Sequence, residues 1–152
     1  MGLLNRIEEL EKELAELKCK VKEGTKFPEY GDIYWCIDAE GIVYVNTFEG
    51  IQADRNILEI GNVFKTKEQA EFAVEKMKVE AELRKFGRPF EYGKFNYCLL
   101  FDIDGNNFRT DVTSYCPSQG AIYFESEEKA KEAVSTVGEE RVKKYIFGVE
   151  ER

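Results

Sequence analysis

The chain has 152 residues, of which 43% are hydrophobic and 34% charged, a composition typical of one globular domain with a short appendage. Its 30 acidic and 22 basic side chains give a net charge of -8, which disfavours non-specific nucleic-acid binding because phosphate backbones are repelled. The sequence contains no apolar run long enough for a membrane span or a signal peptide, so we expect a cytoplasmic protein without a membrane partner.

Residues 1–23 carry the heptad pattern of a coiled-coil oligomerisation helix. Its apolar residues are spaced alternately by four and three positions: Leu3, Ile7, Leu10, Leu14, Leu17 and Val21. In a parallel assembly Arg6 meets Glu11 and Glu13 meets Lys18, so both pairs are opposite in charge. We therefore expect a parallel homo-oligomer, with a dimer favoured and a trimer or tetramer left open. The alternative is an amphipathic helix that folds back on its own domain.

The remaining residues, 24–152, contain one pattern used twice, in halves of about 31–87 and 95–149. Each half begins with two β-rich runs around a turn that contains Asp and Gly, the signal of an antiparallel hairpin. The predicted strands are 33–37 and 42–48 in the first half, and 97–101 and 108–115 in the second. The second turn begins like a calcium loop, but it lacks the later ligands and lies between strands, so we interpret it as a hairpin turn.

A short strand and a helix start follow each hairpin. Residues 62–70 and 122–130 match position by position, with Phe followed two positions later by Thr66 in one segment and Ser126 in the other. Both residues are typical helix N-caps, and Thr66 with Gln69 has the form of a capping box. The sequence therefore predicts an α+β fold, in which an amino-terminal coiled-coil helix precedes a duplicated β-β-β-α unit with an antiparallel sheet.

The helix of the first half has two apolar stripes. The stripe expected to lie on the sheet consists of Ala70, Ala73, Val74, Met77 and Ala81. The second stripe consists of Phe72, Val79, Leu83 and Phe86, and its partner stays open between the amino-terminal helix, the other half and another subunit.

The helix of the second half has one apolar stripe, which consists of Ala130, Ala133, Val134 and Val137. Gly138 is expected to end this helix. Residues 139–144 then read as a polar turn or short helix, and residues 145–147 as a final strand. The basic run of Arg141, Lys143 and Lys144 is interpreted as a solvated face.

The residue types that commonly perform catalysis are missing. The chain has no histidine, and it shows no nucleophile elbow, P-loop or dinucleotide-binding glycine motif. The four cysteines are far apart and read as reduced thiols: Cys19, Cys36, Cys98 and Cys116. We therefore expect no catalytic residues, no metal site and no cofactor.

Aromatic and polar side chains on the strands and loops are the candidates for binding a ligand. If the face of the first strand with Trp35 packs on the helices, Tyr34 on the opposite face lines a binding surface. The candidate ligand-binding residues are Tyr34, Arg55, Arg109, Tyr115, Ser118 and Gln119. The alternatives are a structural core for the aromatic residues and a solvated surface for the polar ones.

The segment 62–71, its continuation to residue 83, and the ending 138–149 resemble parts of uncharacterised phage and prophage proteins of Gram-positive bacteria. These proteins are similar in plan over nearly the whole chain, with a heptad helix, a Trp-containing strand and a Phe-x-Thr/Ser-x-Glu-x-Ala helix start used twice. The resemblance implies a phage accessory protein in the cytoplasm of the infected host.

Since the sequence carries no catalytic motif, we expect such a protein to act by binding. One hypothesis is an anti-defence protein that sequesters a small nucleotide signal in pockets between subunits, where aromatic faces suit bases and loop donors suit phosphates. The alternatives are an acidic inhibitor that binds a host protein in the manner of a DNA mimic, and a structural oligomeric adaptor.

Overall fold

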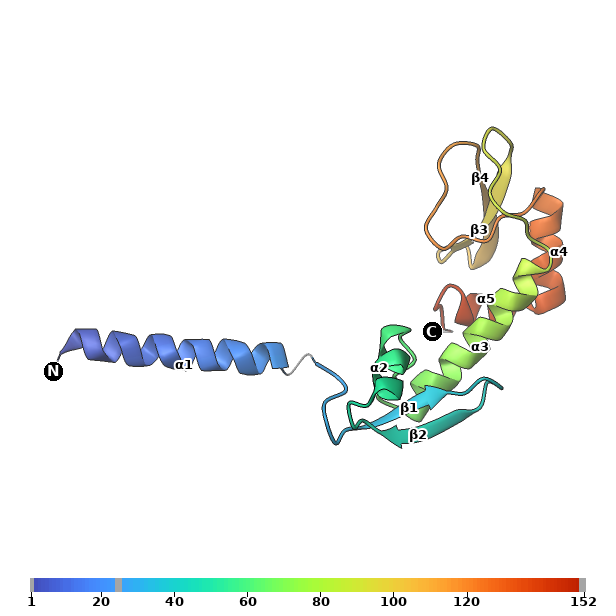
Figure 1. Cartoon of the computed structure of the whole chain (residues 1–152). Helices are drawn as coiled ribbons and strands as arrows, with labels where there is room; N and C mark the ends of the chain where they lie inside the picture. The colour runs from blue at the N-terminus through green and yellow to red at the C-terminus, as the bar shows by residue number, and fades with distance from the viewer. Residues whose placement is uncertain (1, 24–25, 151–152) are drawn as a thin grey trace. The chain divides into compact units, whose positions relative to one another are not determined.

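The structure, a computed structural model, describes residues 2–23 and 26–150 (Figure 1). In this part of the chain it has an α+β fold with five helices and two small antiparallel sheets. The elements are α1 (Leu3–Glu23), β1 (Ile33–Ile37), β2 (Val43–Thr47), α2 (Gln52–Glu59), α3 (Lys67–Arg84), β3 (Asn96–Asp102), β4 (Asn107–Thr113), α4 (Glu127–Val137) and α5 (Glu139–Tyr145). None of the described helices is long and apolar enough to cross a membrane.

Helix α1 covers the segment with the heptad pattern. The apolar residues of the heptads are 47% to 85% exposed where their side chains are described, at Leu3, Ile7, Leu10, Leu14 and Leu17. The side chain of Val21 and the expected helix end at Gly24 lie outside the described residues. The predicted helix is confirmed, and its apolar stripe is not covered within the described chain.

The chain divides into two compact units, Met1–Ala70 and Glu71–Arg152. In the first unit β1 and β2 form an antiparallel hairpin in which Trp35 lies opposite Val45. Tyr34 and Cys36 are fully buried, whereas Ile33 is 62% exposed. The inner face of β1 is therefore the Tyr34 face, opposite to the face that was expected to pack on a helix.

This choice of face follows from α2, a helix that the hairpin pattern did not predict. Ala53 and Ile57 lie on one face of α2, but the helix has only eight residues, too few for the pattern to stand out in the sequence. Asp54 is the buried residue of α2, and its Oδ1 accepts a hydrogen bond of 2.8 Å from the hydroxyl of Tyr34. The hydrogen bond holds Tyr34 inside the unit.

The third strand expected in each half is reduced to isolated bridges. In the first unit Phe64 pairs with Trp35, through N–O distances of 2.9 and 2.8 Å. In the second unit Phe124 pairs with Tyr97 in the same antiparallel manner, at 3.1 and 2.8 Å. The matched Phe residues of the two helix-start segments thus occupy equivalent positions beside their hairpins.

The predicted caps of α3 and α4 are confirmed. Thr66 Oγ1 accepts a hydrogen bond of 3.2 Å from the backbone N–H of Gln69, and Ser126 Oγ accepts one of 3.1 Å from Lys129. The side chain of Gln69 reaches back to accept from the N–H of Lys65. Each cap satisfies a backbone donor that the first turn of the helix leaves free.

The two apolar stripes of α3 are buried in different parts of the helix, the first near its start and the second towards its end. Ala70 and Val74 of the first stripe are buried, but Met77 of the same stripe is 51% exposed. Val79 and Leu83 of the second stripe are buried instead. The expectation that the whole first stripe packs inward is therefore wrong beyond Val74, because the second unit draws its core residues from the second stripe.

The core of the second unit contains the predicted stripe of α4. Its buried residues are Val79, Leu83, Phe124, Ala130, Ala133, Val137 and Val142. Gly138, with φ of 110°, ends α4 and begins α5, a conformation that glycine adopts readily. The expected final strand at residues 145–147 is wrong, because α5 runs to Tyr145 and the next two residues pack against this core.

Candidate ligand-binding site

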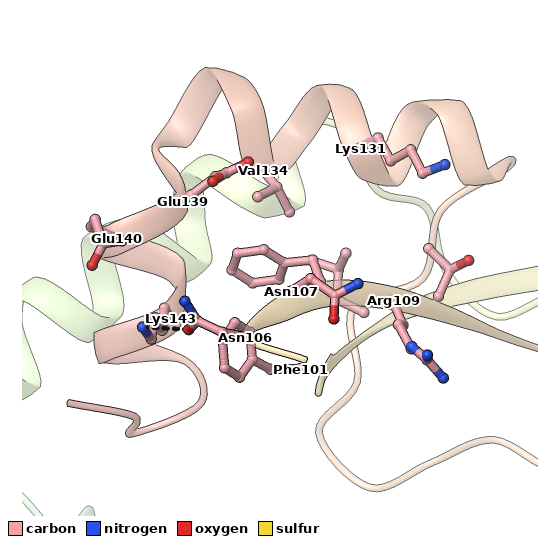
Figure 2. A pocket seen from close by; sticks show the side chains of 12 residues that line it. Phe101, Asn106, Asn107, Arg109, Lys131, Val134, Glu139, Glu140 and Lys143 are labelled. Carbon is pink, nitrogen blue, oxygen red and sulfur yellow. Dashed lines mark hydrogen bonds between the residues drawn. The ribbon is translucent and has the colours of Figure 1, made fainter. Parts of the chain in front are cut away.

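A cavity of about 430 Å³ lies in the second unit, between the β3–β4 hairpin and helices α4 and α5 (Figure 2). This volume falls within the range of small-molecule sites. Its apolar lining consists of Leu99, Phe101, Phe108 and Val134. The polar and charged lining consists of Asn106, Asn107, Thr110, Arg109, Lys131, Glu139, Glu140 and Lys143.

The unusual residue of the cavity is Lys143, a lysine that is only 8% exposed. Its Nζ donates a hydrogen bond of 2.9 Å to Asn106 Oδ1 and lies 5.4 Å from the centre of the Phe101 ring (Figure 2). No carboxylate pairs with it among the residues that the structure describes. A buried ammonium is costly without a counter-charge, and two of its three N–H groups remain for another acceptor.

Local structure fixes Lys143 and its partner. The break at Gly138 starts α5 in a new direction, and Val142 and Lys143 are the buried residues of this helix. Asn106 lies in the hairpin turn with φ of 49°, a conformation that Asn tolerates better than most residues. The same turn is tightened by the N–H of Gly105, which donates to Asp102 Oδ1 at 3.1 Å, so the interpretation as a hairpin turn is confirmed.

The aromatic wall of the cavity is formed by phenylalanine rings that pack on one another. The rings of Phe101 and Phe108 are both partly exposed, with centres 5.1 Å apart and planes at 72°. Phe147 contacts both rings from behind, at 6.1 and 6.0 Å. Aromatic rings in such tilted and edge-to-face arrangements stabilise one another, so this wall offers packed aromatic surface to a planar group.

The other two basic residues of the cavity already have acidic partners. Arg109 Nε lies 3.4 Å from Asp102 Oδ2, and in Figure 2 its guanidinium points away from α4 and α5. Lys131 Nζ lies 3.0 Å from Glu127 Oε1, one turn earlier on α4. Lys143 is therefore the cation of this cavity that lacks a carboxylate partner within the described chain.

Only Arg109, among the six ligand-binding residues expected from the sequence, lines this cavity. The expectation for Tyr34 is wrong, because this residue is buried in the first unit, where burial and the hydrogen bond to Asp54 raise the pKa of its hydroxyl. Arg55 is exposed on α2 of the same unit. The structure does not bring these side chains together with Arg109.

The other three expected residues lie in the long loop that follows β4. Tyr115 is 65% exposed and its ring contacts Tyr92, with centres 5.1 Å apart. The backbone N–H of Ser118 donates a short hydrogen bond to the hydroxyl of Tyr123, and Gln119 is exposed. None of the three lines the cavity at Lys143.

Sequence reasoning missed Lys143 by treating its basic run as a solvated face. Arg141 forms a two-point ion pair with Glu82, at 2.9 and 3.1 Å, which ties α5 to α3 within the second unit. The contacts of Lys143 are with Asn106 and Phe101, which lie far from it in the sequence, so spacing within the basic run carried no signal for this role.

Asp54 of the first unit is the other buried charged residue among those that the structure describes, and both of its carboxylate oxygens are hydrogen-bonded. Its carboxylate accepts from the Tyr34 hydroxyl and from the backbone N–H of Glu49, both at 2.8 Å. These hydrogen bonds, above all the one from Tyr34, lower the pKa of Asp54. We interpret Asp54 as a structural residue.

The described cysteines and acidic groups do not suggest a second site. Burial raises the pKa of the Cys36 and Cys98 thiols, which disfavours the reactive thiolate. No group of side chains able to hold a metal ion occurs among the described residues.

The chain matches no protein-family model, no curated protein and no solved structure.

Proposed function

We propose that this protein is a non-enzymatic binding protein that sequesters a small nucleotide in the cavity lined by Lys143. The observation that carries the proposal is the buried ammonium, which lacks a carboxylate partner in the described chain and lies beside partly exposed phenylalanine rings. A phosphate is a suitable acceptor for a buried ammonium, and a nucleobase is a suitable planar group for an aromatic wall.

The biological setting of this proposal comes from the resemblance to phage proteins. A phage protein that removes a nucleotide signal from the host cytoplasm would act against a host defence pathway. Such a protein needs affinity and specificity, but no catalytic group.

We further propose that the chain is a parallel homo-oligomer, most simply a dimer, held by α1. The exposed heptad residues support this, because an apolar stripe on a helix of 21 residues gains stability by packing on a second helix. The equivalent bridges at Phe64 and Phe124 support an origin of the two halves by duplication. In a dimer each chain would contribute its own nucleotide site.

Ligand binding is tested by heating the intact protein with a panel of nucleotides, each at high concentration. Binding to the native state raises the melting temperature, and the rise grows with the logarithm of ligand concentration over the dissociation constant. The proposal expects a rise with at least one nucleotide and none with its ribose sugar alone. An unchanged melting temperature across mononucleotides and cyclic dinucleotides would contradict it.

Self-association is tested by sedimentation of the intact chain and of a variant with Leu10→Lys and Leu14→Lys in the heptad stripe. The proposal expects an oligomer that becomes a monomer in the variant, because charges in the seam oppose packing. Substitution of Glu9 and Lys12 by alanine, outside the stripe, is the control and is expected to leave the oligomer intact. A monomeric unsubstituted chain would contradict the proposal.

A further inference from the structure

The charges around the cavity restrict the kind of phosphate that it can accept. Lys143 brings one positive charge without a carboxylate partner in the described chain, whereas Arg109 and Lys131 are each held by an acidic residue. Glu139 and Glu140 also line the cavity, and neither forms an ion pair with a described residue. A ligand therefore meets one available cation and two carboxylates.

Neutral donors accompany the single cation. Because Asn106 Oδ1 accepts the hydrogen bond from Lys143, the amide NH₂ group of Asn106 is left as a donor beside the ammonium. Asn107 and Thr110 add further uncharged polar groups to the lining. Glu139 and Glu140 are exposed and screened by water, so the buried ammonium with its neutral donors outweighs them for one negative charge. A second negative charge would find no additional free cation here and would be repelled by the two glutamates.

From this balance we infer that the cavity selects a nucleotide whose phosphate is a diester with a single negative charge, as in a cyclic nucleotide. Nucleotides with a terminal phosphate carry more charge, since a phosphate monoester bears about 1.5 to 2 negative charges at neutral pH. This inference rests on the proposed nucleotide-binding function and specifies the class of ligand. Glu139 and Glu140 are its specificity-determining residues.

The test is a calorimetric titration of the intact protein with five probes: 3′,5′-cyclic AMP, 3′,5′-cyclic GMP, AMP, ATP and adenosine. We expect the cyclic nucleotide that binds better to have at least about tenfold higher affinity than AMP. ATP should bind more weakly than AMP, because each extra negative charge is repelled by the two carboxylates. Adenosine, which lacks the phosphate, is also expected to bind more weakly than cyclic AMP.

A charge-neutral variant isolates the cause of the selection. In the double variant E139Q/E140Q, which retains Lys143, we expect AMP and ATP to gain affinity relative to cyclic AMP. The double variant E125Q/E128Q removes the same charge from exposed positions outside the cavity and is expected to keep the original order. An unchanged order in both variants would overturn the role of the two glutamates.

The remaining outcomes separate this inference from the proposed function. If ATP binds as tightly as the cyclic nucleotides, the single-charge selection is wrong, but nucleotide binding stands. If adenosine binds as tightly as cyclic AMP, the phosphate contact is wrong and the inference fails with it. If none of the five probes binds, both the inference and nucleotide binding at this cavity are contradicted.

Discussion

In the described part of the chain each of the two units buries one charged side chain, and the two differ in how completely that charge is bonded. Asp54 in the first unit is 2% exposed and accepts hydrogen bonds from the Tyr34 hydroxyl and from the backbone N–H of Glu49. Lys143 in the second unit is 8% exposed, yet it donates to one amide oxygen and faces one ring. Asp54 and Lys143 are therefore buried to a similar degree, but they differ in role. Asp54 is a structural residue, whereas Lys143 keeps N–H groups that can donate to another acceptor.

The elements around these two residues are partly shared and partly different. Each unit has a hairpin whose first strand is bridged by the matched phenylalanine, and each of these phenylalanines precedes the cap of a helix, α3 or α4. The parts that differ are α2, which supplies Asp54, and α5, which supplies Lys143. The bridged hairpins form a similar framework in both units. Helices α2 and α5, which have no counterpart in the other unit, supply the two buried charged residues.

The largest effect is expected from the matched phenylalanines. Phe124 is fully buried in its core, whereas Phe64 is only half-buried. Phe124→Ala should lower the free energy of unfolding by about 3 to 5 kcal/mol, and Phe64→Ala by clearly less, because it leaves a smaller cavity. Denaturant titration followed by circular dichroism measures both. Equal losses would show that the two units use this position alike.

A smaller loss is expected from Tyr34→Phe, which removes the hydroxyl but keeps the ring. The bond from this hydroxyl to the Asp54 carboxylate is buried and charge-assisted, so its loss should cost about 2 kcal/mol at neutral pH. The fluorescence of Trp35, the single tryptophan, reports unfolding beside this site. An unchanged denaturation midpoint would mean that Asp54 does not depend on Tyr34.

The stabilisation that Asp54 contributes depends on pH in a definite direction. The folded protein lowers the pKa of Asp54 below its ordinary value of 3.8, so the stabilisation is present above that value and is lost as pH falls through the folded pKa. Asp54→Asn should therefore reduce stability at pH 7 and flatten the decline of stability in acid. Parallel acid-unfolding curves for the variant and the original protein would contradict this account.

The smallest effect on stability is expected from Lys143→Met. The substitution removes one hydrogen bond to Asn106, but it also removes the cost of burying an incompletely bonded charge. The two contributions oppose one another, so the free energy of unfolding should change by less than about 1 kcal/mol or should rise. A loss as large as that of Tyr34→Phe would show that Lys143, like Asp54, is a structural residue.

The sequence predicted the framework better than the site. The four strands, both helix caps and the stripe of α4 depend on local patterns, and the structure confirms them. The apolar pattern of α2 spans only eight residues, so both the helix and the inward orientation of Tyr34 were missed. The role of Lys143 depends on contacts between α5 and a distant hairpin turn, which spacing along the chain does not reveal.

The most direct test of the central claim is the affinity of 3′,5′-cyclic AMP for Lys143→Met and Lys144→Met, measured on the intact protein with AMP as a second probe. Lys144 is the neighbouring lysine on α5, exposed and outside the cavity. If Lys143 binds the phosphate, its variant should lose about tenfold to a hundredfold in affinity, and the Lys144 variant should bind like the unsubstituted protein. Equal affinity in all three proteins, or an equal loss in both variants, would contradict the assignment of Lys143 as the phosphate contact.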